Sequence, residues 1–231
     1  MVLGQILGPA PDLGRGIDRA MTSNVMTSGE FAAQTNVSRE TLARLKIYAT
    51  LLTKWQRRMN LVGTATMPDL WRRHFWDSAQ LARLLPSWDI DLLDFGSGAG
   101  FPGLVLAMMG VRNVNLVEAN TRKCAFLREV ARETGVNIHI HNARIEDLTP
   151  WSVDVVTARA LAPLSNLIEF SLPYMAPSSL CLFLKGKRFK DELTDAEKLC
   201  DIRVYTFKSS VDPEGVILQV KRVDQNGVPN S

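Results

Sequence analysis

The sequence predicts an α/β fold: a mostly parallel, doubly wound sheet with an N-terminal helical portion and a C-terminal antiparallel hairpin. From residue 87 onward, short apolar runs alternate with helical stretches, as in right-handed βαβ crossovers. Between Ser38 and Pro86, apolar residues recur at helical spacing. The chain has 231 residues, 46% of them hydrophobic, which is enough for one large core. We expect a leader (1–36), a helical portion (37–86) and a core (87–231), the last two forming one compact domain.

Residues 1–36 are expected to form a flexible leader, because they are rich in Gly, Pro, Ser, Thr and Met and show no sustained period. The first apolar run, residues 1–7, is brief and follows no basic residue, so we predict neither a signal peptide nor a membrane span. Three scattered cysteines without a Cys-x-x-Cys pair argue against a zinc site or a disulfide framework. We therefore expect a cytoplasmic protein that binds no metal and no membrane, and we expect a monomer.

The helical portion begins at Ser38, a residue type that caps helices, and its apolar residues recur at helical spacing as far as Met59. A second helical pattern runs from about Pro68 until Pro86 ends it. Between Ser38 and Arg73, eight basic residues stand against two acidic ones, a net charge of +6 in a chain whose total is +3. This basic block favours an anionic partner on one face; alternatively, it is a solvated helix surface.

The core is expected to contain five parallel strands followed by a hairpin. The strands are predicted at residues 91–95, 113–117, 137–141, 153–158 and 179–184. The helices between them are predicted at residues 103–109, 122–134 and about 163–172. Two further runs, 202–207 and 216–220, are separated by a polar turn with no room for a helix, which predicts an antiparallel hairpin at one sheet edge.

The first predicted strand runs into closely spaced glycines and then a helix, in the run Asp-Phe-Gly-Ser-Gly-Ala-Gly-Phe-Pro-Gly at residues 94–103. Gly96, Gly98 and Gly100 would let the backbone approach a ligand where any Cβ would obstruct it. The turn alone is ambiguous, since residues 98–103 also satisfy the Gly-x-Gly-x-x-Gly pattern of dinucleotide-binding dehydrogenases.

Two carboxylates bear on the choice between S-adenosylmethionine and a dinucleotide. Asp94 ends the first strand, where it can receive the cationic end of an amino-acid moiety, directly or through water, and would repel a pyrophosphate. Glu118 ends the second strand, where it can accept hydrogen bonds from both ribose hydroxyls of either ligand. Asp94 thus favours S-adenosylmethionine. The alternatives are that Asp94 caps a helix and that Glu118 faces solvent.

Residues after the third and fourth strands complete the predicted ligand site. The loop at 143–147 would close over an adenine with a backbone amide and an apolar side chain. Arg159 follows the fourth strand at the carboxyl edge, where open α/β sheets bind their ligands. A guanidinium there can hold a carboxylate or a phosphate; alternatively, it makes a surface salt bridge.

Several spaced motifs together resemble one family. They are Trp-Gln-Arg-Arg-Met-Asn-Leu (55–61), Arg-His-Phe-Trp-Asp-Ser (73–78), the glycine-rich run, Glu118 followed by Lys123 and Phe126-Leu127, Ala-Arg-Ile-Glu (143–146), Ala-Arg-Ala (158–160) and Lys-Gly-Lys (185–187). From about Val37 to the last hairpin, the chain resembles the bacterial 16S ribosomal RNA guanine-N7 methyltransferases, the glucose-inhibited division protein B family. It departs from the family at Ala158, usually a serine, in its long leader, and at residues 212–215, which lack the usual Glu-Arg-His.

The resemblance implies a class I (Rossmann-like) methyltransferase fold, S-adenosylmethionine as methyl donor, and one guanine of 16S ribosomal RNA or the small ribosomal subunit as substrate. With the reasoning above, it predicts cofactor contacts at Asp94, Gly96, Ser97, Gly98, Gly100, Phe101, Glu118, Ala119, Asn120, Ile145, Glu146 and Arg159. The basic residues expected to meet RNA phosphates are Lys54, Arg57, Arg58, Arg72, Arg73, Lys185 and Lys187. An exposed aromatic, Trp55 or Phe101, would stack on a base, although core packing is the preferred interpretation of Trp55. His74 and Asp77, one helical turn apart, are either a structural pair or a ligand contact.

Methylation at guanine N7 needs no general base, because N7 carries an in-plane lone pair and no proton. Consistent with this, no Asn-Pro-Pro-Tyr motif follows the fourth strand, and no cysteine stands where a cytosine-C5 enzyme keeps its nucleophile. We therefore predict no catalytic side chain, only alignment of N7 with the methyl group. Three alternatives stay open: a methyltransferase acting on a small molecule or protein, a dehydrogenase, and a non-catalytic RNA-binding module.

Overall fold

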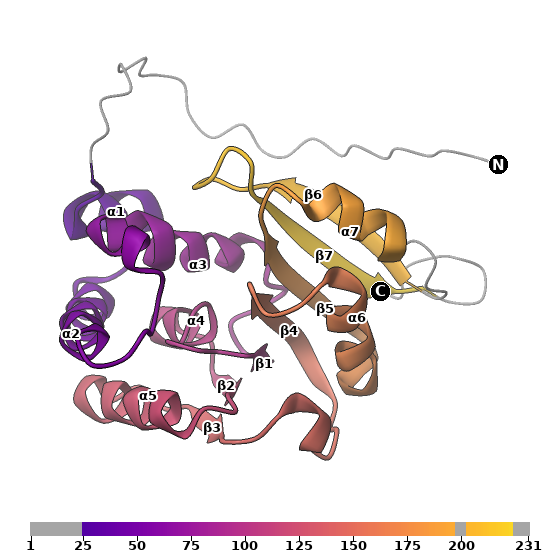
Figure 1. The fold of residues 1–231 in the computed structure, drawn as a ribbon, viewed down its shortest axis with the longest axis horizontal. Coiled ribbons are helices and arrows are strands. Elements are labelled where there is room, and N and C mark those ends of the chain that lie inside the picture. The colour runs from indigo at the N-terminus through magenta and orange to yellow at the C-terminus, as the bar shows by residue number, and fades with distance from the viewer. Residues whose placement is uncertain (1–24, 197–201, 224–231) are drawn as a thin grey trace.

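The computed structural model describes residues 25–196 and 202–223. They form a seven-stranded sheet in the order β3-β2-β1-β4-β5-β7-β6 with helices on both faces (Figure 1). Strands β1 to β5 are parallel, whereas β7 runs antiparallel to both β5 and β6. The strands are β1 (Asp91–Phe95), β2 (Asn113–Val117), β3 (His139–His141), β4 (Val153–Arg159), β5 (Met175–Lys185), β6 (Ile202–Lys208) and β7 (Val216–Arg222).

The winding of the sheet reverses at β1, which pairs with β2 on one side and β4 on the other. The connections on the two sides of β1 therefore diverge, and a crevice opens at the carboxyl ends of β1 and β4, the usual ligand position in such sheets. The helices of the core are α4 (Gly103–Met109), α5 (Thr121–Thr134), α6 (Leu164–Ser171) and α7 (Phe189–Ala196), with the short helices η4 (Ile145–Asp147) and η5 (Leu172–Tyr174).

Both faces of the sheet are covered by apolar layers. Successive strand residues point into opposite layers, so that Leu92 packs with α4 and α5 while Leu93 packs with α6, and Val155 and Val156 divide in the same way. All four are fully buried. The N-terminal helices extend the layer formed by α4 and α5, whereas α6 and α7 lie on the opposite face (Figure 1).

The predicted strands, their directions and the C-terminal hairpin are confirmed, with shifted ends. The third strand is shorter than predicted, and β5 begins at Met175 instead of 179, with a register shift against β4 between Val153 and Val155. Helix α7 was not predicted, although Phe189, Leu193 and Ala196 recur at helical spacing, because the pattern extends over only eight residues. Among the described residues, no helix is long and apolar enough to cross a membrane.

The predicted flexible leader is wrong for its last part, which forms helix α1 (Ser28–Thr35). Thr27 and Glu30 form a capping box, so the backbone N–H groups at the helix start are paired. Phe31 is fully buried, with its ring 5.4 Å from Trp71. One buried aromatic and a cap therefore fix a segment whose composition indicates flexibility. The rest of the predicted leader, residues 1–24, lies outside the described residues.

The helix capped by Ser38 is confirmed as α2 (Arg39–Gln56), but the second predicted helix changes type along its length. It consists of η1 (Thr64–Asp69), η2 (Trp71–Trp76), α3 (Asp77–Ala79) and η3 (Gln80–Leu84). Segment η2 is a π-helix, and the backbone N–H of Asp77 donates to the carbonyl of Arg72, five residues earlier. Such π segments are frequent at functional sites. Here the segment carries His74 and leads into Asp77, which both line the crevice.

Candidate cofactor and substrate site

The turn after β1 has a backbone that only glycine adopts readily. Gly96, Gly98 and Gly100 have φ values of +59°, +58° and +99°. A Cβ at Gly96 would lie 2.5 Å from the Leu161 side chain, whereas a Cβ at Gly98 would approach no heavy atom closer than 3.7 Å. Gly98 therefore presents bare backbone to open space, as a cradle for a ligand requires.

Two hollows meet at this turn and share Gly96, Lys123 and Ala160. The first, which we call the apolar hollow, has a volume of about 510 Å³ and lies between the ends of β1, β2 and β4. Ile145, Leu161 and Phe170 line it, and the Glu118 carboxylate offers hydrogen-bond acceptors beside them; the polar side chains of Glu146 and Arg144 also line it. An apolar slot beside a carboxylate matches the base and ribose of a nucleoside.

Glu118 is held in place by the backbone around it. Its Oε2 accepts from the N–H of Gly98 at 2.8 Å, and its Oε1 accepts from the N–H of Asn120 at 2.7 Å. The residue is 8% exposed. Because a carboxylate offers about four lone-pair positions, each oxygen can still accept one hydroxyl. The interpretation of Glu118 as a solvent-facing residue is therefore wrong, and its carboxylate is oriented before any ligand arrives.

The second hollow, the charged hollow, has a volume of about 440 Å³ and continues the groove toward the N-terminal helices. Arg73, Arg159 and Lys123 line it together with Asp77 and Asp212. Cations and carboxylates in one small space match a zwitterion, such as the amino-acid end of S-adenosylmethionine. A pyrophosphate would meet two carboxylates in the same place.

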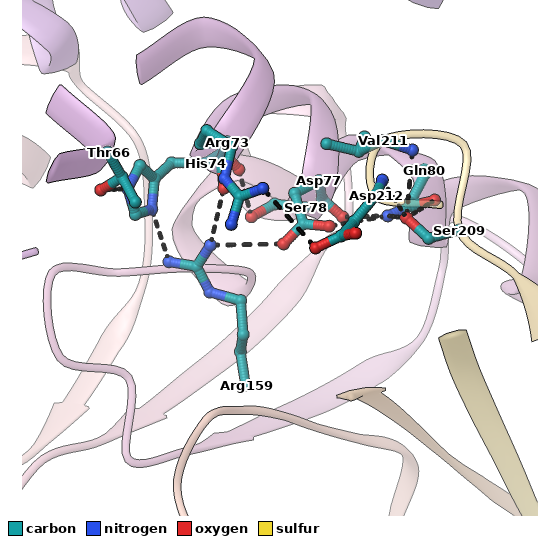
Figure 2. A network of polar contacts seen from close by, with 10 residues as sticks. All are labelled: Thr66, Arg73, His74, Asp77, Ser78, Gln80, Arg159, Ser209, Val211 and Asp212. Atoms are coloured by element: carbon teal, nitrogen blue, oxygen red, sulfur yellow. Dashed lines mark hydrogen bonds and ion pairs between the residues drawn. The ribbon is translucent and has the colours of Figure 1, made fainter. Parts of the chain in front are cut away.

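Arg159 is the centre of a polar network in the charged hollow (Figure 2). Its guanidinium donates to Nδ1 of His74 at 2.9 Å, to the carbonyl of Arg73 at 3.2 Å, and to Oδ2 of Asp77 at 3.4 Å. Its Cζ lies 5.0 Å from the centre of the Phe101 ring. These contacts use three of the five N–H groups and leave two without a partner among the described residues. Arg159 is thus fixed and can still donate to a ligand.

The network determines the protonation state of His74. Nδ1 must accept from Arg159, so the ring hydrogen is on Nε2, which lies 2.7 Å from Oγ1 of Thr66; the Thr66 hydroxyl in turn donates to the carbonyl of Gly63 at 2.6 Å. Burial lowers the pKa of His74 to about 3, and the positive charges of Arg159 and Arg73 act in the same direction. His74 is therefore neutral, with both ring nitrogens occupied.

Asp94 lies beneath the glycine turn instead of in it. It is fully buried, and its Oδ1 accepts a hydrogen bond from the Thr157 hydroxyl at 2.7 Å. Burial raises the pKa of Asp94 to about 6, and the hydrogen bond from Thr157 opposes the rise. Its Oδ2 has no hydrogen-bond partner among the described residues. Asp94 lines neither hollow in this structure, so its contact with a ligand, directly or through water, stays a prediction.

The loop between β6 and β7 forms a distant wall of the charged hollow. Ser209 exchanges hydrogen bonds with Gln80, and the N–H of Ser210 donates to the same side chain at 2.8 Å. Arg73 lies 3.5 Å from Asp212, across the mouth of the hollow (Figure 2). The segment in which the sequence departs from the family's Glu-Arg-His thus supplies a carboxylate to the site.

Comparisons with known proteins place the chain in a family. The family model described as "rRNA small subunit methyltransferase G" (GidB) matches residues 41–215. The chain belongs to this family. The resemblance inferred from the sequence motifs is therefore confirmed.

The chain also covers nearly the whole length of curated relatives named "Ribosomal RNA small subunit methyltransferase G". The proteins from Paramagnetospirillum magneticum and Rhodospirillum rubrum are each 52% identical, over 85% and 86% of this chain and 96% and 98% of theirs. Among solved structures, a ribosomal protein L11 methylase from Lactobacillus delbrueckii subsp. bulgaricus aligns with a TM-score of 0.55 at 15% identity, over 64% of this chain and 76% of its own. A TYW2 from P. horikoshii, solved with MeSAdo, aligns with a TM-score of 0.52 at 15% identity, over 64% and 61%. The Rossmann-like methyltransferase fold is confirmed.

Most of the predicted cofactor residues gather around the two hollows. Those lining at least one of them are Gly96, Ser97, Gly98, Phe101, Glu118, Ala119, Ile145, Glu146 and Arg159. Asn120 instead caps α5 and donates its N–H to Glu118. Gly100 is buried in the turn, where a Cβ would lie 2.9 Å from the Tyr48 hydroxyl. Both therefore act on the shape of the site in this structure.

Two side chains considered as RNA contacts, Phe101 and Lys185, are buried in this structure. Phe101 is 3% exposed and stacked on Tyr48 at 5.2 Å, so it is no open platform for a base. The ammonium group of Lys185 binds Glu192 and the carbonyl of Ala162, both at 2.6 Å, and its side chain is 8% exposed. The preferred interpretation of Trp55 as a core residue is confirmed, since its ring packs on Phe126 at 5.6 Å.

The other predicted RNA contacts are distributed over several surfaces. Arg73 lines the charged hollow, whereas Lys54 and Arg57 line a larger hollow of about 550 Å³ between residues 25–26, α2 and η1, which shares no lining residue with the charged hollow. Arg58 lies beside the start of α5, and Lys187 follows β5. Arg72 pairs with Asp69 at 2.9 Å. The predicted RNA contacts therefore do not form one cluster in this structure.

Two site residues were missed and two were left open. Tyr48 donates to the carbonyl of Ala99, 51 residues away, and Thr157 is the partner of Asp94. Neither has a local sequence signal, because each acts through a distant segment. His74 and Asp77 were an open choice between a structural pair and a ligand contact. In the structure they bind Arg159 instead of each other and line the charged hollow.

The buried His74 predicts how stability depends on pH. Its native pKa of about 3 lies below the unfolded value of 6.5, so the unfolded chain binds the proton more strongly between these values. The contribution of neutral His74 to the free energy of unfolding is therefore fully present above pH 6.5. Below pH 6.5 it falls by about 1.4 kcal/mol per pH unit. Between pH 7 and 5, we expect His74→Asn to lose about 2 kcal/mol less stability than the wild type. Urea denaturation at both pH values measures this difference. The raised pKa of Asp94 changes stability with pH in the opposite direction, but Asp94 is present in both proteins and its effect cancels in the comparison. Equal losses of stability in the wild type and His74→Asn would contradict the assignment of His74 as a buried neutral histidine.

Proposed function

We propose that the chain transfers the methyl group of S-adenosylmethionine to N7 of a guanine in 16S ribosomal RNA, within the small subunit or its RNA. The observation that carries the proposal is the pairing of the two hollows at the glycine turn. One has an apolar slot beside the oriented Glu118 carboxylate, and the other combines cations with carboxylates. A nucleoside joined to an amino acid matches both, whereas a dinucleotide matches only the first. Membership of the ribosomal RNA methyltransferase family supports the choice of substrate.

In this proposal, Glu118 binds the ribose hydroxyls, and Ile145 and Leu161 enclose the adenine. Arg159 offers its two remaining N–H groups to the carboxylate, and Lys123 adds a further positive charge to the same hollow. Asp94 acts indirectly, because its bond to Thr157 ties the carboxyl ends of β1 and β4 together beneath the turn. S-adenosylmethionine supplies an electrophilic methyl group, whose bond to sulfur breaks, with its electrons left on sulfur, as the N7 lone pair forms the new bond.

The side chains of the groove are consistent with a reaction that needs no general base. His74 is neutral, but Arg159 occupies its only ring lone pair. Asp94 is buried away from both hollows. The protein's contribution is then to hold the acceptor in line and to exclude water, an effect of proximity worth up to about 7–11 kcal/mol in favourable cases. We further propose that the protein acts as a monomer in the cytoplasm.

Methyl-labelled cofactor tests the proposal. The purified protein is incubated with 30S subunits or naked 16S RNA from cells lacking it, and the labelled nucleoside is then identified. We expect 7-methylguanosine as the labelled product. Label on another atom, or on no RNA in either form, would refute the assignment. Label on protein or on a small molecule would instead support the alternative methyltransferase.

A further inference from the structure

A third hollow adjoins the groove at the carboxyl ends of β4 and β5. It has a volume of about 490 Å³ and shares Ala160 with both hollows of the groove. We call it the β5 hollow. The loop after β4 and the loop after β5 form its walls, and Glu192 of α7 lines it. Its volume lies within the roughly 300–1,000 Å³ typical of ligand pockets.

Glu192 has one oxygen anchored and one oxygen available. Its Oε2 accepts from the Lys185 ammonium at 2.6 Å and from the N–H of Leu164, the first residue of α6, at 2.8 Å. Its Oε1 has no hydrogen-bond partner among the described residues, and the side chain is 27% exposed. Lys185 also binds the Ala162 carbonyl. The carboxylate is therefore held at a fixed angle by three elements, with both lone pairs of Oε1 free.

A fixed carboxylate oxygen in a base-sized hollow distinguishes guanine from the other bases. Guanine presents two adjacent donors, N1–H and the N2 amino group, on its Watson–Crick edge. Adenine and cytosine present an acceptor at the central position of that edge, and uracil flanks its single donor with two acceptors. Only guanine can donate two hydrogen bonds to one carboxylate oxygen without bringing an acceptor atom of the base against that oxygen. Unstacked RNA bases are commonly recognised on this edge.

The rest of the β5 hollow suits the same ligand. Leu161 is an apolar side chain with 40% exposure and can lie against a base. Lys187 and Arg188 are exposed and line the same hollow, where phosphates of an RNA strand could reach them. N7 belongs to the five-membered ring, away from N1 and N2. With the Watson–Crick edge at Glu192, the imidazole part of the base lies toward Ala160, where the three hollows meet.

We propose that the β5 hollow receives the acceptor guanine and that Glu192 selects it by accepting hydrogen bonds from N1–H and the N2 amino group. This inference rests on the proposed function and adds the position and the recognition of the acceptor base. Lys185 acts in it as a positioning residue, because it holds the Glu192 carboxylate. This role explains why a lysine expected to meet RNA is buried in an ion pair.

The test compares guanosine with inosine, which lacks only the N2 amino group. Both are placed by ligation at the methylated position of 16S RNA, which is assembled into 30S subunits. For the wild type, we expect kcat/KM with inosine to be lower than with guanosine by about tenfold or more, because inosine loses one hydrogen bond to a charged acceptor. In Glu192→Gln this preference is expected to shrink to about twofold or less, together with a fall in kcat/KM for guanosine.

Asp191→Asn is the matched control, because it removes an exposed carboxylate from the same helix. It should keep the guanosine preference of the wild type. If Glu192→Gln does not fold, Glu192→Asp retains the charge but shortens the reach and should show the same loss of preference. Affinity for S-adenosylhomocysteine should be unchanged in folded variants.

The outcomes separate the two proposals. A wild type that methylates guanosine, with a preference over inosine that Glu192→Gln retains, overturns the assignment of Glu192 and leaves the proposed function standing. A wild type that methylates no RNA overturns the proposed function itself.

Discussion

Replacing Gly100 with alanine is expected to lower the free energy of unfolding by about 3 kcal/mol. Gly100 has a φ of +99°, and a non-glycine residue in such a conformation costs roughly 1–3 kcal/mol. The added Cβ would also lie 2.9 Å from both the Leu104 Cβ and the Tyr48 hydroxyl, and overpacking a core typically costs about 1–3 kcal/mol. Tyr48 cannot yield freely, because it donates to the carbonyl of Ala99 and stacks on Phe101. Urea denaturation measures the loss.

Gly135 provides a matched control. It ends α5 with a φ of +65°, and a Cβ there would meet nothing within 4 Å. Gly135→Ala therefore introduces the conformational strain without the clash and should cost about 1 kcal/mol. Equal losses for the two variants would show that the tight packing around the turn contributes nothing. A larger loss at Gly100 supports the packed turn.

Glu118→Gln is expected to weaken S-adenosylhomocysteine binding by about 100-fold or more. In the wild type, the two carboxylate oxygens accept hydrogen bonds from the backbone N–H groups of Gly98 and Asn120. Whichever way the amide turns, its NH₂ group faces one of these backbone donors. Hydrogen bonds to a charged group contribute about 1.5–3 kcal/mol each, so losing the equivalent of two ribose contacts gives a change of this size. Isothermal titration calorimetry measures the affinity.

Glu169→Gln is the control for charge and isosteric shape, because Glu169 is exposed on α6 and lines neither hollow of the groove. Its affinity should match that of the wild type. A Glu118→Gln variant that binds the ligand as tightly as the wild type would mean that the nucleoside lies elsewhere. A thermal unfolding midpoint for each variant separates loss of the site from loss of the fold.

Features with a local signal could be predicted from the sequence. The buried strands are short continuous apolar runs, such as β1 and β4, and their alternation with helices determines the parallel winding. The positive φ angles of Gly96, Gly98 and Gly100 are a local requirement of the turn, so the glycines indicate it directly. Glu118 was predicted because its place at the end of a strand follows from the same winding. These elements form the part of the groove that we propose for the cofactor.

Features that depend on distant contacts could not be predicted. The sequence allows Phe101 to be an exposed aromatic that stacks on a base. In the structure, Tyr48 and Phe75 from the helical portion bury it. Lys185 is a basic residue that the sequence allows to contact a phosphate. In the structure it pairs with Glu192, which lies in a helix that was not predicted. Helix α1 depends on Phe31 packing against Trp71, 40 positions along the chain. In each case one long-range contact overrides the local pattern.

The central claim is that the groove at the glycine turn holds a methyl donor and not a dinucleotide, and calorimetry with both ligands tests it most directly. S-adenosylhomocysteine and NAD are titrated separately into the wild-type protein. We predict saturable binding of one S-adenosylhomocysteine per chain, lost in Glu118→Gln, and no measurable binding of NAD. Tight binding of NAD together with no binding of S-adenosylhomocysteine would contradict the account.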